Sequence, residues 1–286
     1  MNTLTLAEPI FLRNLMIYPI NNGYDDKKLA VNTIEDNIEY SAGAFHELDV
    51  PDVNKVFFDN QGNLPVLMID GEEITGSLQN RIIARSTMVA AHTIANIPVI
   101  CAEQNRWEGL GTFKTGYCSY PKIRSILAAS KNRINDIQKR VWKEIERKLT
   151  ITRTKSRTSS MHEIYDNLEE EVERYLEGFE GLNHRTIGFI GVAGNRILCC
   201  DIFRTPDIYY KFEKKLLRSY ALDALEYQQR TERQTPVKDF FKRITAKFTT
   251  VKTKKSLMHL KFSENGFVGQ AIFYKNEPVH ISAFPA

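Results

Sequence analysis

The sequence predicts an α+β fold in which helices pack on a mainly antiparallel β-sheet, arranged as a sandwich or an open barrel. In the first third of the chain, short apolar runs separated by turn residues recur at roughly ten-residue spacing. The middle third has helical periodicity, and the last third alternates between strand and helix patterns. Grouped strands and grouped helices in this order are typical of the α+β class.

Length and composition agree with this class. The chain has 286 residues, of which 42% are hydrophobic and 26% are charged. These values are ordinary for a globular protein of one large domain or two modest ones. We expect a single compact domain over 1–286, with a β-rich part (1–120), a helical pair (121–180) and a mixed β/α part (181–286).

The first part of the chain predicts short strands. An apolar run covers 11–20 and a short helix is expected over 33–40, and strands then follow at 44–48, 55–59, 64–69, 81–89 and 93–101. Between the second and third of these strands lies Asn60-Gln61-Gly62-Asn63. Because Gly and Asn accept positive φ, this segment predicts a β-hairpin.

Two helices are predicted in the middle. Pro121 suits the first turn of a helix, and apolar residues recur at helical spacing from Ile134 to Leu149. Ser160 and Glu163 have the spacing of a capping box, which begins a second helix whose apolar stripe continues to Phe179. Residues 151–159 lack an apolar period and are expected to form a loop.

The last third predicts a hairpin, two helices and three final strands. Strands over 187–192 and 196–203 flank Ala193-Gly194-Asn195, and a long helix is expected over 206–228. Thr235-Pro236 begins another short helix. The remaining strands are predicted at 257–263, 267–274 and 278–284, the last two joined by a turn at Lys275-Asn276.

Charge is unevenly distributed. The total is only +4, but residues 122–157 carry 12 basic and 3 acidic side chains, whereas 158–181 carry 1 and 8. One interpretation is that these helices pair with each other, within the chain or between subunits. The other is that the basic segment 122–157 contacts phosphate groups, although it lacks the interleaved aromatic residues that single-strand binding favours.

Location signals are few. No apolar run is long enough to span a bilayer, and the start of the sequence does not resemble a signal peptide. The four cysteines include an adjacent pair and no Cys-x-x-Cys, which is typical of reduced thiols. We therefore expect a cytoplasmic protein without a membrane partner.

The common catalytic and cofactor motifs are missing. Residues 109–115 imitate a phosphate loop, but their Lys follows Phe rather than Gly, so a turn is the preferred interpretation. The sequence contains neither a Gly-x-Ser-x-Gly elbow nor a His-Glu-x-x-His motif, and the six histidines are at least 21 residues apart. No metal site is predicted, and the cofactor is unknown.

Two polar runs follow predicted strands and are the best candidates for a site. Residues 70–81 come after one buried run, and residues 101–107 end another predicted strand. If both strands belong to one sheet, carboxylate, amide, guanidinium and indole groups could converge there. The alternatives are a ligand site, a buried ion-pair network, or polar loops without a function. The candidates for general base are Glu73 and Glu103. The candidates for ligand binding are Glu72, Gln79, Asn80, Arg81, Arg106 and Trp107.

Three further polar features have structural interpretations. Asp201 lies in an apolar strand and, by alternation, shares a face with Cys199 and Phe203. A buried carboxylate needs a partner, so we expect amides or a basic group beside it. The line Lys215, Ser219, Asp223 is interpreted as a solvated helix face, and His280 as a hydrogen-bonded core or edge residue.

Four runs together resemble a known family. LPVLMIDGEEITGSLQNR, IPVICAEQNRW, KKLLRSYALDAL and PVHISAF span residues 64–284 and resemble the ADP-ribosylglycohydrolase-and-rhodanese-phosphatase-associated protein domain family. The charged middle, 131–180, resembles it least. The resemblance implies processing or sensing of NAD-derived compounds such as ADP-ribose, including in phage conflict, but it supplies no reaction. The candidate residues named above, with Gly76, occupy the polar motifs of that family.

The function expected from this resemblance is binding, with or without processing, of an ADP-ribose-like, nucleotide-like ligand. An enzyme of this kind would be a hydrolase or transferase, with Arg81 and Arg106 on phosphate, Trp107 stacking and Gln79 and Asn80 on hydroxyl groups. The alternatives are a non-enzymatic homo-oligomeric assembly or sensor subunit, and a nucleic-acid-binding protein using 122–157.

Overall fold

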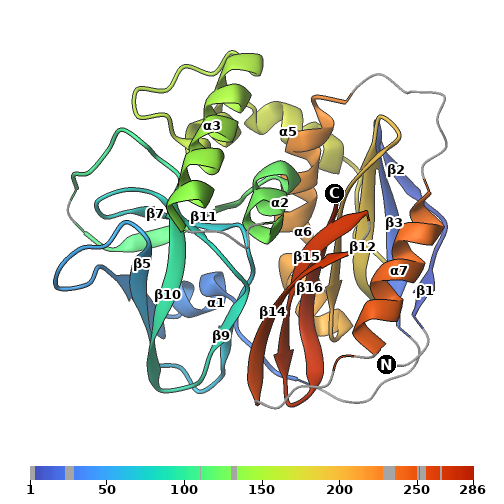
Figure 1. Ribbon diagram of the computed structural model, residues 1–286, viewed down its shortest axis with the longest axis horizontal. Helices are drawn as coiled ribbons and strands as arrows, with labels where there is room; N and C mark the ends of the chain where they lie inside the picture. Colours follow the sequence, from blue (N-terminus) through green and yellow to red (C-terminus); the bar gives the residue numbers. More distant parts are fainter. Residues whose placement is uncertain are drawn as a thin grey trace. The chain divides into compact units, whose positions relative to one another are not determined.

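The computed structural model describes residues 4–22, 29–109, 111–129, 134–227, 236–249, 251, 256–264 and 266–286. These residues form seven helices and sixteen strands, and all the strand pairs in their sheets are antiparallel (Figure 1). The predicted α+β class with mainly antiparallel sheet is therefore confirmed. The chain divides into two compact units, unit 1 (Met1–Leu29 with Glu170–Ala286) and unit 2 (Ala30–Glu169). The expectation of one domain over 1–286 stays a prediction.

Unit 2 is built on a six-stranded sheet with the order β11-β7-β8-β10-β5-β4, and a two-stranded sheet, β6-β9, accompanies it. The strands are β4 (Gly43–His46), β5 (Lys55–Asn60), β6 (Val66–Met68), β7 (Glu72–Gly76), β8 (Arg81–Ile83), β9 (Thr87–Val89), β10 (Thr93–Cys101) and β11 (Phe113–Cys118). Their buried side chains form one apolar core that includes Phe45, Phe58, Ile74 and Val99.

The predicted hairpin at 60–63 is wrong. β5 pairs with β4 and β10, whereas β6 pairs with β9 in the other sheet. Asn60 is fully buried, and its side-chain amide donates to the carbonyls of Leu64 and Ala90 at 3.0 and 2.9 Å. The Asn and Gly signal therefore marks the end of β5 and a change of sheet.

Two other expectations in this part differ from the structure. The run predicted as one strand over 81–89 is two strands, β8 and β9, in different sheets. The strands β7 and β11 were not predicted, because their polar residues resemble those of loops. β11 pairs with β7. Residues 113–115, the last part of the segment that imitates a phosphate loop, therefore belong to the sheet.

The helices of unit 2 are α1 (Ile34–Glu39), α2 (Pro121–Ala129), α3 (Ile134–Ile151) and α4 (Met161–Asn167). α1 begins at a complete capping box made by Thr33 and Asp36. α3 is attached to β10 by Gln138, whose side-chain amide accepts from the Cys101 amide at 2.8 Å and donates to the Cys101 carbonyl at 2.9 Å.

The second predicted helix is interrupted. α4 ends with Leu168 as its C-cap, and α5 (Glu169–Leu176) comes next. Ser160 is the N-cap of α4, as predicted, and accepts from the His162 amide. The predicted capping box is wrong. It required the backbone amide of Ser160 to donate to the Glu163 side chain, but this amide donates to the Ser156 hydroxyl at 2.9 Å.

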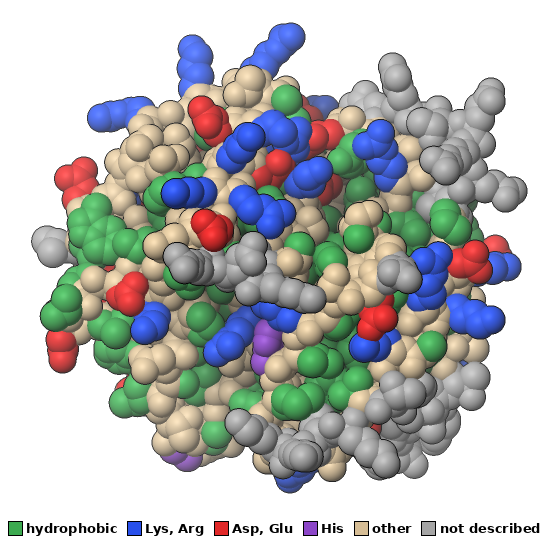
Figure 2. All heavy atoms as spheres, viewed as in Figure 1, with side chains coloured by type: hydrophobic (Ala, Val, Ile, Leu, Met, Phe, Trp, Pro, Cys, Tyr) green, Lys and Arg blue, Asp and Glu red, His purple; other side chains and the backbone are tan. Residues whose placement is uncertain are grey.

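The basic segment 122–157 is only partly exposed. Lys143 and Arg153 are exposed, and Figure 2 shows Lys and Arg side chains gathered over α3 with acidic ones between them. Arg124 and Lys148, however, are fully buried. Lys148 lies over the Tyr120 ring, with its Nζ 4.1 Å from the ring centroid. The segment is therefore not a uniformly solvated edge.

Unit 1 contains an eight-stranded sheet with the order β1-β3-β12-β13-β16-β15-β14, and β2 pairs with β3. The strands are β1 (Thr5–Leu6), β2 (Ile10–Leu12), β3 (Leu15–Asn21), β12 (Thr186–Ala193), β13 (Arg196–Phe203), β14 (Leu257–Glu264), β15 (Phe267–Tyr274) and β16 (Glu277–Pro285). The hairpin β12-β13 and the three final strands are confirmed. Gly194 and Asn195 both have positive φ at the predicted turn.

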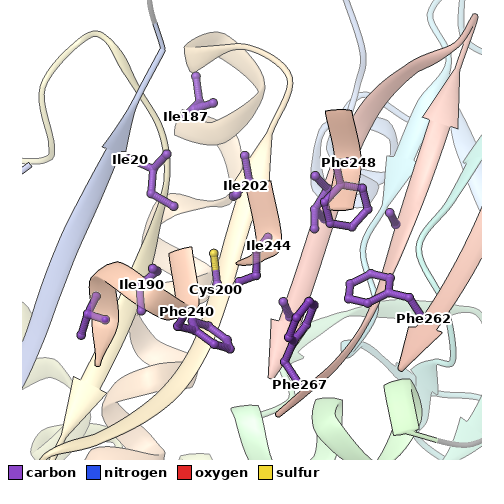
Figure 3. Packing of buried hydrophobic residues seen from close by; sticks show 14 of the residues in the cluster. Ile20, Ile187, Ile190, Cys200, Ile202, Phe240, Ile244, Phe248, Phe262 and Phe267 are labelled. Carbon is purple, nitrogen blue, oxygen red and sulfur yellow. The ribbon is translucent and has the colours of Figure 1, made fainter. Parts of the chain in front are cut away.

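Helices cover both faces of this sheet. α7 (Val237–Thr249) places Phe240, Ile244 and Phe248 against Cys200, Ile202 and the aromatic residues of β14 and β15 (Figure 3). α6 (Pro206–Ala224) covers the opposite face, because Asp201 alternates with Cys200 and Ile202 and contacts Tyr220 of α6. Thr235, predicted to begin α7, lies outside the described residues.

Within the helices that the structure describes, none combines the length and the apolar composition needed to cross a bilayer.

On α5, Glu173 forms an ion pair with Arg218 of α6, and Glu170 pairs with Arg174 one turn away on the same helix.

Candidate functional site

The loop after β7, which is the second half of the first polar run, and the run that follows β10 lie together in unit 2. β8 links them, since Arg81 is the register partner of Cys101. The Ala102 amide donates to the Asn80 carbonyl at 2.9 Å, and the Glu108 amide donates to the Leu78 carbonyl at 3.1 Å. The convergence expected from the sequence is thus present in the backbone itself.

Arg106 and Glu103 tie these loops to each other. Arg106 Nε donates to Glu103 Oε2 at 2.7 Å, Nη1 donates to the Ser77 carbonyl at 2.7 Å, and Nη2 donates to Asn80 Oδ1 at 3.0 Å. Glu103 also accepts from the Asn80 amide and from the Thr158 hydroxyl, at 3.1 and 2.7 Å. With this many partners inside the protein, both side chains are suited to hold the loops in place.

Arg81 lies beneath Trp107. Its side chain is fully buried, and Nη1 donates to the carbonyls of Asp52 and Val53 while Nη2 reaches Glu47 at 3.2 Å. Burial lowers the pKa of Arg81, and the nearby Glu47 opposes that shift. Trp107 is 47% exposed, and the Arg81 guanidinium carbon lies 5.5 Å from the centroid of its ring. The indole therefore forms an open aromatic surface over a fixed cation.

Two buried polar atoms near this aromatic surface have no hydrogen-bond partner among the described residues, namely Arg81 Nε and Gln79 Oε1. The amide nitrogen of Gln79 donates to the Arg106 carbonyl at 3.1 Å, which fixes the side chain. Such unsatisfied groups cost stability where they are buried, so they are common at sites that bind ligands or water.

Glu73 pairs with His162, a residue that the sequence did not indicate as part of the site. Its Oε2 lies 2.7 Å from Nδ1 of His162 on α4, and its Oε1 has no partner among the described residues. Glu73 is buried, whereas the His162 side chain is 31% exposed. Asp166 Oδ1 lies 3.6 Å from Nε2, and the Tyr117 ring is 4.9 Å from the imidazole.

Burial and charge shift the pKa values of this pair. Burial raises the pKa of the Glu73 carboxyl, and the hydrogen bond from His162 opposes this only in part. Burial alone would lower the pKa of His162, but the hydrogen bond and negative charge of Glu73, together with the charges of Asp166 and Glu103, raise it overall. A carboxylate behind an imidazole in this way can fix its tautomer and orientation.

The Glu73–His162 pair adjoins the loop network. The Ser160 hydroxyl accepts from the His162 amide at 3.2 Å and from the Asn80 side-chain amide at 3.4 Å. Ser160 also forms an isolated β-bridge with Glu103. The candidate site therefore consists of three segments, 76–81, 103–107 and 158–162, with Glu73 beneath them.

Glu72 lies apart from this site. Successive residues of β7 point to opposite faces, so Glu72 and Glu73 diverge. Glu72 Oε2 accepts from the Ile69 amide at 2.7 Å, close to the buried ion pair of Asp70 and Arg124, which are 3.1 Å apart. Of the eight candidate residues, the structure thus brings seven near one another and separates Glu72.

Unit 1 contains a separate buried cluster around Asp201. The carboxylate accepts from the Tyr220 hydroxyl at 2.6 Å and lies 3.0 Å from His280 Nε2, and Cys199 Sγ is 3.5 Å away. A Cβ at Gly191 would lie 2.2 Å from the Tyr220 ring, so the Tyr220 position needs this glycine. The structural interpretations of Asp201 and His280 are consistent with these bonds.

The interpretation of Lys215, Ser219 and Asp223 as a solvated face is wrong. Ser219 and Asp223 are buried, and Lys215 is half-buried. Helical spacing alone could not distinguish a polar face in water from one that is covered.

Over the described part of the chain, no group of three or more His, Cys, Asp or Glu residues is placed to hold a metal ion.

Comparison with known proteins identifies the family. No curated protein and no solved structure gives a significant match. The family model described as "ARG and Rhodanese-Phosphatase-superfamily-associated Protein domain" matches residues 3–284, nearly the whole chain, including all three segments of the candidate site. The chain therefore belongs to the ARG and Rhodanese-Phosphatase-superfamily-associated Protein domain family.

Proposed function

We propose that this protein binds an NAD-derived, ADP-ribose-like ligand at the candidate site of unit 2. The family description links the chain to ADP-ribosylglycohydrolase and rhodanese-phosphatase contexts, which favours a ligand of this class. A role in phage conflict and a cytoplasmic location stay predictions.

The observation that carries the proposal is the exposed Trp107 ring over the buried Arg81 guanidinium. In this proposal Trp107 stacks on the adenine or nicotinamide ring, since base–aromatic stacking suits any base. Arg81 supplies positive potential for the phosphates. Arg106, Glu103 and Asn80 keep the two loops in register through their mutual hydrogen bonds.

Ligand binding is expected to weaken when Trp107 is replaced by alanine. Loss of stacking should cost about 1–3 kcal/mol, or roughly 5- to 150-fold in dissociation constant. Trp107 and Trp142 are the two tryptophans of the chain, so in a Trp142→Phe background all tryptophan emission comes from Trp107. Titration of that variant with ADP-ribose, NAD, ADP-ribose phosphates and nicotinamide should quench its emission selectively.

Thermal unfolding is the second readout, and it is the one that applies to Trp107→Ala, which has lost the fluorescent residue. A ligand at about 100 times its dissociation constant adds roughly 2.7 kcal/mol, which raises the midpoint by roughly 5–10 °C. The matched control for Trp107→Ala is Ile94→Ala, because Ile94 is an exposed apolar residue at the start of β10, away from the loops of the site. If none of the four probes, with or without magnesium or manganese, changes emission or midpoint, the proposed function is wrong.

A second candidate function is favoured by a groove on α3. An open groove of about 620 Å³ runs along this helix, where Arg140, Lys143 and Arg147 recur at helical spacing. It is lined by Ile126, Arg140, Lys143, Glu144, Glu146, Arg147, Thr150 and Ile151. We propose nucleic acid as its alternative ligand, in keeping with the expected role of the basic segment 122–157.

Removing two cations from this groove tests the alternative. A gel shift with a single-stranded RNA of about 20 nucleotides should weaken in the double variant Arg140→Gln, Lys143→Gln, and its salt slope should fall by about 1.4. The loop variant Arg153→Gln, Lys155→Gln, Arg157→Gln distinguishes the groove from the neighbouring loop. An RNA that fails to shift with the unmodified chain at low salt removes this candidate.

A further inference from the structure

We infer that His162 is the proton-transfer group of the candidate site and that Glu73 is its buried positioning residue. The inference rests on the proposed function and assigns it a chemistry. It also changes the expected role of Glu73, since the group that faces the ligand is the imidazole rather than the carboxylate.

Accessibility separates the two side chains. Glu73 is fully buried in β7, so its carboxylate cannot meet a ligand at the surface. His162 is 31% exposed, and its Nδ1 is occupied by Glu73 at 2.7 Å. When Nδ1–H donates to Glu73, the lone pair of Nε2 is left on the outer side of the ring. This is the arrangement of a general base supported from behind by a carboxylate.

The surroundings of the imidazole are consistent with this role. The charged and titratable groups that face it are Glu73 of β7, Tyr117 of β11, Asp166 of α4 and, at longer range, Glu103. Asp166 Oδ1 is 3.6 Å from Nε2, beyond hydrogen-bond distance, and accepts from the Tyr117 hydroxyl at 3.1 Å instead. Nε2 is thus left with a nearby negative charge but without a direct hydrogen bond to it.

The backbone at Gly116 makes room for the pair. A Cβ at this position would lie 2.4 Å from Glu73 Oε2 and 3.0 Å from Glu73 Cγ, where no carboxylate could remain. The glycine is on β11, next to Tyr117, and Glu73 Oε2 accepts from the Tyr117 amide at 3.3 Å. Gly116 therefore permits the Glu73–His162 contact without taking part in it.

The reaction class is hydrolysis of the ADP-ribose-like ligand. His162 Nε2 accepts a proton from a water molecule, while the water oxygen forms a bond to an electrophilic atom of the ligand, an anomeric carbon or a phosphorus. The bond to the leaving group breaks, and the leaving group departs with the electron pair. It then takes the proton from the imidazolium, which returns His162 to its neutral form.

The first experiment measures product release from ADP-ribose and NAD by chromatography and mass spectrometry over pH 5–9. His162→Gln is expected to lower the rate at least ~100-fold, the lower value for general acid–base catalysis. Glu73→Gln should lower it about 10-fold and move the acidic limb of the pH profile to lower pH, because the charge that raises the pKa of His162 is gone. His92→Gln, at an exposed histidine directly before β10, is the matched control.

The second experiment follows the imidazole itself. An NMR titration should give His162 a pKa above the usual value in the unmodified chain, and a lower pKa in both Glu73→Gln and Gly116→Ala. The glycine variant leaves both side chains of the pair intact, so a fall there reports their geometry. An unchanged His162 pKa in both variants would overturn the positioning role of Glu73.

The outcomes for the site and for the chemistry can be told apart. If the probes quench Trp107 but no product appears, or if His162→Gln releases product at the unmodified rate, the proton-transfer inference is overturned and the binding function stands. If no probe binds, the proposed function fails, and the inference that rests on it fails with it.

Discussion

An Arg124→Met variant is expected to lose about 3–5 kcal/mol of unfolding free energy, because it removes the cation that the buried Asp70 carboxylate faces. Arg124 and Asp70 have no exposed side-chain surface, and Arg124 Nε lies 3.1 Å from Asp70 Oδ2. Asp70 also accepts from the Ser86 hydroxyl at 3.0 Å, which holds its carboxylate in place. The midpoint of thermal unfolding should fall by roughly 6–20 °C.

Two further variants separate the charge effect from lost packing. Adding Asp70→Asn to Arg124→Met neutralises the remaining charge, and we expect it to recover roughly 0.5–3 kcal/mol of the loss. The matched control is Arg174→Met, since Arg174 and Glu170 form an exposed pair worth about 0–1 kcal/mol. If Arg124→Met unfolds at the same temperature as Arg174→Met, the buried ion pair does not stabilise the fold.

The burial of Arg124 could not be predicted from the sequence. The segment has 12 basic residues, and the pattern of apolar residues did not single out Arg124 and Lys148 as the two that are fully buried. The apolar spacing of α3 predicted the helix itself, because one face must be covered. It did not predict the cations whose long side chains are also covered.

Local turn chemistry predicted the hairpins of unit 1 but not the partner of β5. Gly194-Asn195 and Lys275-Asn276 join strands that are adjacent in the sheet, and all four residues have positive φ. Asn60-Gln61-Gly62-Asn63 has similar residues, yet β5 and β6 belong to different sheets. A turn signal marks where a strand ends, whereas long-range pairing decides which sheet the next strand joins.

The candidate site was predictable to the extent that it depends on neighbouring strands. The loops after β7 and β10 converge because β8 lies between these strands in the sheet. His162, Thr158 and Glu47 were missed, because each reaches the site from a segment 30 to 89 residues away from its partner. The divergence of Glu72 from Glu73 follows from strand alternation, but the polar run was not interpreted as a strand.

Glu72 gives the second large prediction, a loss of stability as pH rises. Burial raises the pKa of Glu72 from 4.5 to about 8, and the hydrogen bond from Ile69 and the charge of Arg124 oppose that shift only in part. Between these pH values the folded state keeps the proton while the unfolded state releases it. The folded state therefore binds more protons, and its stability falls with rising pH by at most about 1.4 kcal/mol per unit.

A Glu72→Gln variant should remove this dependence. The contribution of Glu72 is fully present below pH 4.5 and is lost as pH rises through about 8, a difference of at most about 5 kcal/mol. Relative to the unmodified chain, the variant should therefore gain stability steadily from pH 5 to pH 8.5, as measured by urea unfolding at each pH. Glu146→Gln, an exposed glutamate of α3, controls for the loss of one carboxylate. Parallel curves for the unmodified chain and Glu72→Gln would mean that Glu72 stays ionised in the folded state, with Arg124 and the Ile69 amide outweighing its burial.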